Sequence, residues 1–443
     1  MDRWRPPASD RALGLEFYVS NAPGVAARIK SSPEEFRVHE VSSYPLPDAN
    51  GEFTVLRVES RDWEQHELAE AIARRLGLGR HALQWAGTKD RRAVSERLFS
   101  YRGPPPTGDV GLRDVRLLEA YRARDGLVLG HLYGNVFDLT LADLAGSPGE
   151  VAPVLAGIAT ELRAAGGFPN FFGAQRFGEV RPITHEVGRW VVRGDLGRAI
   201  DVYLSDRPAT GTAGVGDAAR ASYAAHHDAA RALREFPREY RFERALLERL
   251  ARGDSSDRAF RSLSRDLRTL FVHAFQSLVF NRWVSARHAA GLPPATPVPG
   301  DRILRIARDG TVRGPDAVPV AADNLPECRE LVTKGRALLA GPLVGFDTPE
   351  GAEPPVALLD RILADEAVER SMFRVPAAPE VASSGAWRPV VVPMPPVTFV
   401  PEADRVRCRF ALPKGAYATV LLREFLKTGA TPVSEDVPSS RAF

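Results

Sequence analysis

Apolar and polar residues alternate strictly over residues 405–412, near the end of the chain. A period of two predicts a strand with one buried face and one exposed face. The two faces consist of Val406, Cys408, Phe410 and Leu412 on one side and Arg405, Arg407, Arg409 and Ala411 on the other. Lys414-Gly415 then predicts a turn, and the spacing over Tyr417–Lys427 predicts a terminal helix.

The first third of the chain mixes strand and helix patterns. Strands are predicted over 52–59, 94–101 and 135–141. Apolar residues at helical spacing predict helices over 63–76 and 151–165, and glycines follow both segments. This part is therefore of mixed α and β character.

The middle of the chain has a different pattern. Residues 217–252 and 257–288 are rich in Ala, Leu and Arg at helical period. Proline-rich segments at 292–300 and 375–400 are typical of connectors and domain crossings. A sheet begun in the first third and completed near the C-terminus, with a helical block between, predicts an insertion within one domain.

Composition places the chain among soluble globular proteins of two or three domains. It has 443 residues, of which 44% are hydrophobic and 26% charged. The net charge is only +3, so a nucleic-acid surface would require local segregation of charge.

The N-terminus lacks the apolar run of a signal peptide, and no stretch approaches the roughly 20 apolar residues of a membrane span. The two cysteines, Cys328 and Cys408, have no second ligand at metal-binding spacing. We expect a cytoplasmic protein without membrane contact. No heptad run demands a partner, so a monomer is the default.

The segment 86–96 concentrates residues that carry chemistry. It places Asp90 between Lys89 and the pair Arg91 and Arg92, in a predicted loop. Neighbouring cations favour an ionised carboxylate, and guanidinium groups match the geometry of phosphate oxygens. Only five of the 59 basic residues are lysine, which suggests that Lys89 supplies a compact ammonium. A reactive carboxylate beside phosphate-binding groups indicates chemistry on a nucleotide.

Residues 170–178 interleave aromatic rings with Gln175 and Arg176. This pattern fits a surface that offers a ring and a cation to RNA. It fits a domain hinge that packs its own phenylalanines equally well.

Several other enzyme classes lack their sequence signatures. There is no phosphate-binding Gly-x-x-x-x-Gly-Lys-Ser/Thr and no Gly-x-Ser-x-Gly elbow. A non-catalytic RNA-binding or RNA-chaperone protein remains an alternative, with the arginines of 405–409 and the Asp90 loop as a clamp. A metal-dependent nuclease using Asp90 would lack its usual second carboxylate.

The chain resembles the TruD family of tRNA pseudouridine synthases, in its larger, archaeal-type form. Five motifs that occur in the order of that family carry the resemblance: Ile29-Lys30 with Pro33–Glu40, Ala86–Ala93, Gly134–Phe137, Asn170–Gly178 and Leu412–Thr419. They span nearly the whole chain.

The resemblance implies an isomerase that converts a uridine of tRNA, by default uridine 13, to pseudouridine without cofactor or metal. It implies an α+β fold: a pseudouridine-synthase catalytic domain with a mainly antiparallel mixed sheet, interrupted by a largely helical α/β insertion (TRUD) domain. The expected parts are 1–166 and 392–443 for the catalytic domain and 167–391 for the insertion region. Which uridines and RNAs are accepted stays open.

The resemblance also implies residue roles. Asp90 would be the catalytic carboxylate, attacking either ribose C1′ or C6 of the base. The implied substrate-binding residues, around a flipped and stacked base, are Phe36, Lys89, Asn135, Phe137 and Tyr417. The RNA-binding candidates are Lys30, Arg91, Arg92 and Arg176.

Taken singly, these residues have simpler interpretations. Asp90 fits a turn aspartate paired with a neighbouring arginine, Phe36 and Phe137 fit core positions, and Gly134-Asn135 fits a turn. The five-motif set favours the catalytic interpretation. Tyr417 stands where some members of the family have phenylalanine, which keeps a stacking ring but casts doubt on any role for its hydroxyl.

Overall fold

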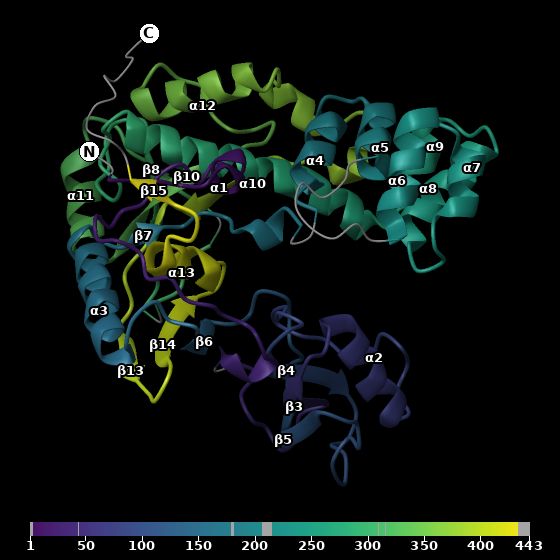
Figure 1. The fold of residues 1–443 in the computed structure, drawn as a ribbon, viewed down its shortest axis with the longest axis horizontal. Helices are drawn as coiled ribbons and strands as arrows, with labels where there is room; N and C mark the ends of the chain where they lie inside the picture. Colours follow the sequence, from purple (N-terminus) through teal and green to yellow (C-terminus); the bar gives the residue numbers. More distant parts are fainter. Residues whose placement is uncertain are drawn as a thin grey trace. The chain divides into compact units, whose positions relative to one another are not determined.

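The computed structural model describes residues 3–42, 44–178, 181–205, 215–308, 310–314 and 316–432, so residues 433–443 of the expected C-terminal part lie outside it. The chain forms two compact units (Figure 1). Unit 1 consists mainly of Tyr18–Phe168 and Pro393–Ala430, and unit 2 mainly of Arg5–Phe17 and Pro169–Val392. Unit 1 is therefore built from two stretches far apart in the sequence.

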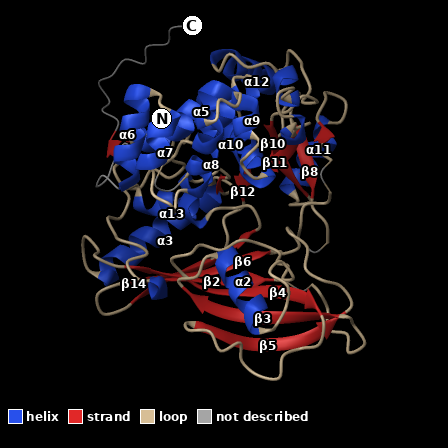
Figure 2. Cartoon of the chain, turned by 90° about the vertical axis from the view of Figure 1, so that its right-hand side faces the viewer, coloured by secondary structure: helices blue, strands red, loops and turns tan. Residues whose placement is uncertain are grey.

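A seven-stranded sheet forms the centre of unit 1 (Figure 2). Its strands, in spatial order, are β13 (Val397–Pro401), β14 (Val406–Pro413), β6 (Gly134–Leu141), β2 (Phe36–Val41), β4 (Val94–Arg102), β3 (Phe53–Arg61) and β5 (Val115–Ala123). β2 and β4 pair in parallel, and the other neighbours pair antiparallel. The expected mainly antiparallel mixed sheet is confirmed.

The strand and helix predictions for unit 1 hold. The predicted strands correspond to β3, β4, β6 and β14, and the predicted helices to α2 (Gln65–Arg75), α3 (Pro148–Ala164) and α13 (Ala418–Leu426). In β14, burial alternates residue by residue as the pattern requires. The edge strand β5 escaped prediction because its burial does not alternate cleanly, which leaves no period to detect.

Helices cover one side of this sheet. Leu68 and Ile72 of α2 join Leu56, Val58 and Phe99 of β3 and β4 in one core cluster. α3 packs against β13 and β14, and α13 packs against α3. This buried side carries the apolar half of each alternating strand.

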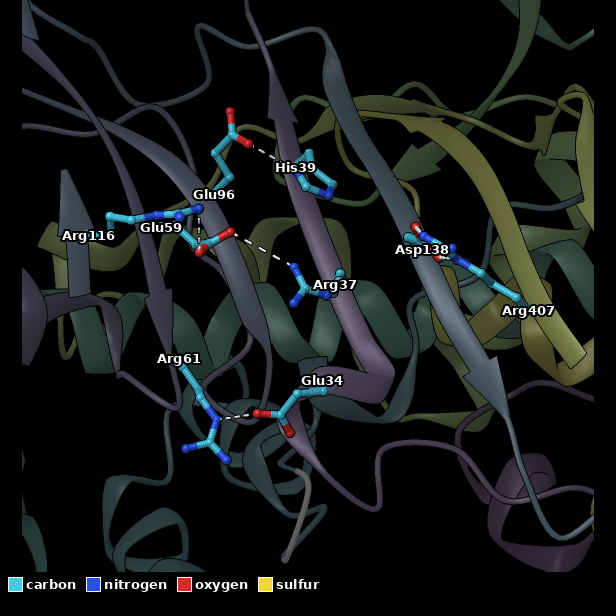
Figure 3. Close-up of polar contacts among 9 residues, drawn as sticks. All are labelled: Glu34, Arg37, His39, Glu59, Arg61, Glu96, Arg116, Asp138 and Arg407. Atoms are coloured by element: carbon cyan, nitrogen blue, oxygen red, sulfur yellow. Dashed lines mark hydrogen bonds and ion pairs between the residues drawn. The ribbon is translucent and has the colours of Figure 1, made fainter. Parts of the chain in front are cut away.

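The other side of the sheet is covered near Val55 and Leu98 by a smaller apolar cluster, and elsewhere it carries paired charges (Figure 3). Glu59 pairs with Arg37 and Arg116, His39 with Glu96, and Glu34 with Arg61. Arg407 Nε donates a hydrogen bond to the Asp138 carboxylate at 2.7 Å. The hydrogen bond from Arg407 holds the pKa of Asp138 below its usual value. The arginine face predicted for 405–412 is therefore partly neutralised by the Asp138 carboxylate of the adjacent strand β6.

Unit 2 is mainly helical, as the middle of the sequence predicts. Its helices are α4 (Thr184–Val192), α5 (Leu196–Ser205), α6 (Val215–His226), α7 (Ala229–Glu235), α8 (Arg241–Ala251), α9 (Ser256–Phe260), α10 (Arg265–Ala289), α11 (Leu325–Thr333) and α12 (Pro354–Asp365). α10 is largely buried. A four-stranded sheet adds the order β11 (Ala386–Pro389), β10 (Ala337–Leu343), β8 (Arg302–Arg305), β9 (Val318–Pro319).

Short elements complete the described part of the chain. They are β1 (Trp4–Arg5), α1 (Ala8–Ala12), β7 (Phe168–Pro169), β12 (Val391–Val392), β15 (Thr431–Pro432) and the 3-10 turns Pro33–Glu35, Ala174–Arg176, Arg370–Arg374 and Pro379–Val381. None of the helices in the described ranges is both long and apolar enough to cross a membrane.

The segment Arg5–Phe17 packs with unit 2 although it precedes unit 1 in the sequence. The Asn281 side chain of α10 donates to Leu13 O at 2.9 Å, and the Ser285 hydroxyl donates to Gly14 O at 2.7 Å. Directly after it, the buried Glu424 carboxylate of α13 accepts hydrogen bonds from the backbone of Val19 and Ser20 in unit 1. The pattern of apolar residues did not predict that Arg5–Phe17 belongs to unit 2 while the residues that follow belong to unit 1.

Gly134 allows β6 to approach β14 closely, since a Cβ atom there would lie 2.0 Å from Leu412 O. We predict that Gly134→Ala lowers the free energy of unfolding by about 1–3 kcal/mol, the usual cost of overpacking. Gly157→Ala is the matched control, because a Cβ on that exposed face of α3 meets no atom within 4 Å. It should gain about 0.5–1 kcal/mol. Equal denaturation midpoints for the two variants would contradict the close-approach argument.

Candidate active site

Asp90 lies in the predicted loop, four residues before β4 begins. Lys30 Nζ donates to the Asp90 carboxylate at 2.6 Å. The side chains of Lys30 and Asp90 are 16% and 34% exposed, so the carboxylate keeps contact with solvent. Lys30 comes from 60 residues upstream, and no local pattern singled it out as the partner of Asp90.

The backbone of Lys30 is left-handed, with φ of 60°. For a residue other than glycine this conformation costs about 1–2 kcal/mol. Strained residues of this kind cluster at functional sites, where the surrounding structure holds them in place.

Aromatic rings extend from this ion pair into the sheet. Lys30 Nζ lies 3.8 Å from the Phe36 ring centroid. The Phe36 and Phe137 rings meet edge to face at 6.1 Å, and Phe137 stacks on Phe410 at 5.4 Å. All three rings are buried, so the core interpretation of Phe36 and Phe137 is correct as far as packing goes. Phe36 also contacts the cation that holds Asp90.

The register of three strands positions Asn135. It lies opposite Glu40 of β2 and Leu412 of β14, while Phe137 lies opposite Val38 and Phe410. Because residues two apart share a face of a strand, Asn135 and Phe137 point to the same side as Glu40.

Lys89 forms an ion pair with Glu40 on this side of the sheet. Its Nζ lies 2.5 Å from the Glu40 carboxylate, and the two side chains are 2% and 1% exposed. Burial lowers the pKa of Lys89, and the Glu40 charge opposes that shift. Arg97, also buried, donates to Gln65 at 2.6 Å, and burial lowers its pKa to about 10. The lysine next to Asp90 in sequence is thus part of a buried charge cluster.

Two buried acceptors on neighbouring strands have no hydrogen-bond partner among the described residues. They are Glu40 Oε1 and Asn135 Oδ1, whose residues are directly opposite in register. An unsatisfied buried acceptor costs about 1–3 kcal/mol, and a ligand that brings an N–H donor would relieve that cost. Sequence reasoning missed Glu40, although it ends one of the quoted motifs.

The other candidates of unit 1 flank these residues. Arg92 donates to Ser31 O at 2.7 Å, and both Arg91 and Arg92 are exposed. Tyr417 is half-buried at the start of α13, after a turn in which Lys414 Nζ donates to Gly130 O at 2.9 Å. Gly130 N in turn donates to Ala86 O, just before the Asp90 loop.

Arg176 belongs to unit 2, and its Nε donates to Ser277 Oγ at 3.2 Å. The phenylalanines around it, Phe171, Phe172 and Phe177, are buried. Of the two interpretations left open for this segment, the burial of the rings favours the one in which the phenylalanines pack within the protein, while Gln175 and Arg176 stay partly exposed.

Among the residues that the structure describes, no cluster of three or more His, Cys, Asp or Glu side chains has the arrangement of a metal site. Both cysteines are buried, and burial raises the pKa of the Cys408 thiol to about 12.

The chain is similar to known proteins over nearly its whole length. The model of the family "tRNA pseudouridine synthase D (TruD)" matches residues 12–425. A probable tRNA pseudouridine synthase D of Halobacterium salinarum is 37% identical over 432 residues, covering 94% of this chain and 97% of that protein. Its counterpart in Pyrococcus furiosus is 34% identical, covering 95% and 100%. A crystal structure of a TruD protein from Methanosarcina mazei superposes with a TM-score of 0.80 at 29% identity, covering 95% and 98%.

We predict that Glu40→Gln lowers the free energy of unfolding by about 3–5 kcal/mol, because it leaves the Lys89 ammonium buried without a counter-charge. Replacing both partners, as Glu40→Gln with Lys89→Met, should recover much of that loss. Glu52→Gln breaks the exposed ion pair with Arg102 and is the control, with an expected change within about 1 kcal/mol. Chemical denaturation followed by circular dichroism measures all three. A Glu40→Gln midpoint equal to that of Glu52→Gln would contradict the prediction.

Proposed function

The chain belongs to the TruD family of tRNA pseudouridine synthases, and we propose that it isomerises uridine 13 of tRNA, with Asp90 as the catalytic carboxylate. The observation that carries this proposal is the carboxylate of Asp90, one third exposed and held by Lys30 at 2.6 Å. An ionised carboxylate fixed by a neighbouring cation and open to a ligand is what nucleophilic catalysis requires.

The reaction moves one bond and one proton. The bond between N1 of uracil and C1′ of ribose breaks, a bond between C5 and C1′ forms, and the proton of C5 is lost while N1 gains one. Product and substrate have the same composition, so no cofactor is consumed. Asp90 would attack either C1′, releasing uracil, or C6 of the base. The two routes stay open.

Asn135 and Glu40 support recognition of uracil. A base must leave its stack to reach a carboxylate held between the loop and the sheet, and its Watson–Crick edge then needs partners. Uracil carries a hydrogen on N3. Glu40 Oε1 or Asn135 Oδ1, which have no hydrogen-bond partner among the described residues, would accept a hydrogen bond from this N–H group. Cytosine has no hydrogen on N3, so the same acceptors would disfavour it. Phe36, Phe137 and Tyr417 would border the base, the buried rings through their edges.

The remaining residues of the site would support this arrangement. Lys89, which is almost fully buried against Glu40, suits a positioning role better than contact with substrate. Lys30 would orient Asp90, and the exposed Arg91 and Arg92 suit phosphate contacts. In this proposal unit 1 is the catalytic domain and unit 2 the insertion domain. Asp90 and the base-binding residues all belong to unit 1 of the same chain. In this proposal the protein therefore acts on cytoplasmic tRNA as a monomer.

The alternative of a non-catalytic RNA clamp finds less support. It relied on the Asp90 loop and on the arginines of 405–409, of which Arg407 pairs with Asp138 and Arg405 with Asp404. Paired charges release fewer counterions and attract RNA less strongly.

We predict that Asp90→Asn abolishes pseudouridine formation and changes RNA affinity little, because the substitution keeps the shape and removes the charge. The assay incubates wild-type and variant with an unmodified tRNA transcript. Carbodiimide and alkali treatment then reveals pseudouridine as reverse-transcriptase stops. Asp143→Asn is the matched control, since Asp143 is an exposed carboxylate paired with Arg28 at 2.6 Å. A wild-type stop at uridine 13 that persists in Asp90→Asn would refute the assigned role.

We predict that Arg176→Ala weakens binding across tRNAs and lowers the slope of log affinity against log salt by about 1, as loss of one phosphate contact should. Arg231→Ala is the control, because Arg231 is already paired with Glu235 on α7. Filter binding at several salt concentrations measures both slopes. An unchanged slope in Arg176→Ala would restrict that arginine to a structural role.

A further inference from the structure

Unit 2 contains a cavity of about 390 Å³ that the proposed reaction does not use. It lies between one face of the sheet β11-β10-β8-β9 and the first turn of α12; β8, β10, β11 and α12 are labelled in Figure 2. Its volume falls in the range of about 300–1,000 Å³ that is typical of ligand sites.

Arg302 of β8 and Trp387 of β11 form the planar wall of this cavity. Arg302 is opposite Ala340 of β10, and Trp387 is opposite Pro342. Since residues two apart share a face of a strand, Arg302 and Trp387 lie on the same face of the sheet. The small Ala340 side chain lets the guanidinium reach across β10 to within 4.7 Å of the indole centroid.

The charge of Arg302 has no counter-ion among the described residues. Its Nη1 donates to Ala317 O at 3.0 Å. Burial lowers the pKa of this guanidinium, with no carboxylate opposing the shift. A guanidinium stacked on an indole gives a flat, polarised surface, which binds other planar rings well.

The opposite wall is apolar and its rim is acidic. Trp283 of α10 lines the wall, with its indole N–H bonded to Pro355 O at 2.8 Å. Glu350 and Glu353 are exposed at the rim, and neither has an ion-pair partner in the described part of the chain. Gly300 allows the backbone to pack closely against Glu353, because a Cβ there would lie 2.3 Å from Glu353 Cβ. Carboxylates at the mouth of a flat pocket accept hydrogen bonds from amino groups.

We propose that this cavity is a second nucleobase site, which stacks an unpaired base on Trp387 and Arg302 and binds its exocyclic amino group through Glu350 or Glu353. Adenine, cytosine and guanine carry such a group and uracil does not, so the site selects a different base from the reacting uridine. The base belongs either to the RNA substrate, an assignment that rests on the proposed function, or to a free nucleotide.

The test measures tRNA affinity at fixed salt for wild-type, Trp387→Ala and Trp387→Phe. Loss of one stacked base is worth about 1–3 kcal/mol, which corresponds to about 5- to 150-fold weaker binding for Trp387→Ala. Trp387→Phe should retain most of the affinity. The salt slope should stay unchanged, because stacking releases no counterions. Phe242→Ala is the control, since Phe242 is an aromatic residue, 47% exposed, on α8 and outside the cavity.

Equilibrium dialysis with AMP, CMP, GMP and UMP distinguishes the two sources. Micromolar binding of an amino-bearing nucleotide that Trp387→Ala abolishes would identify a free effector. Millimolar or weaker binding, together with Trp387-dependent tRNA affinity, would assign the base to RNA. The exposed Glu353→Gln, combined with Glu350→Gln, should reduce the preference over UMP without altering the melting temperature, which covers the case of a misfolded Trp387→Ala. Wild-type affinity of Trp387→Ala for tRNA, with no Trp387-dependent nucleotide binding, would overturn the inference.

Binding and turnover separate this inference from the proposed function. A wild-type chain that makes no pseudouridine but binds tRNA in a Trp387-dependent manner would refute the proposed uridine 13 reaction and support the cavity. A chain that modifies tRNA with affinity indifferent to Trp387 would do the reverse.

Discussion

The antiparallel pairing of β6 with β14 is the constraint on which unit 1 depends. These strands are separated in sequence by most of unit 2, yet they pair along their full length from Gly134 to Leu141. The pairing joins the two stretches of unit 1 that flank the insertion in the sequence. It also sets the register of Asn135 and Phe137 and brings the turn before Tyr417 to the loop that contacts Ala86. The candidate site therefore exists only when both ends of the unit have met.

Charge is arranged differently on the two sides of this sheet. The solvent side carries ion pairs such as Arg37 with Glu59, exposed and individually worth little. The other side carries the Lys89–Glu40 pair, which is removed from water and depends on its partner for stability. Asp90 stands between these extremes, since it is paired but one third exposed. That intermediate position keeps a carboxylate both ordered and reachable.

Sequence reasoning succeeded where a period decides the answer. The alternation of 405–412 identified β14 and its buried face, and helical spacing identified α2, α3 and α13. It failed where a side chain's position depends on a contact with a residue far away in the sequence. Nothing local says that Lys30 reaches Asp90 or that Lys89 turns to Glu40, because partner choice depends on strand register across the sheet. Likewise, the rings of 171–177 match a binding surface in composition, and only their burial in unit 2 shows that they pack inside.

The left-handed backbone of Lys30 lowers the stability of the fold, while its side chain holds the proposed catalytic carboxylate. Glycine or asparagine would adopt φ of 60° at a lower cost than lysine. Selection for a stable fold alone would thus favour either of them there, at the expense of the ammonium that meets Asp90. An engineer who raises the thermal tolerance of this protein by relieving backbone strain must therefore leave position 30 alone.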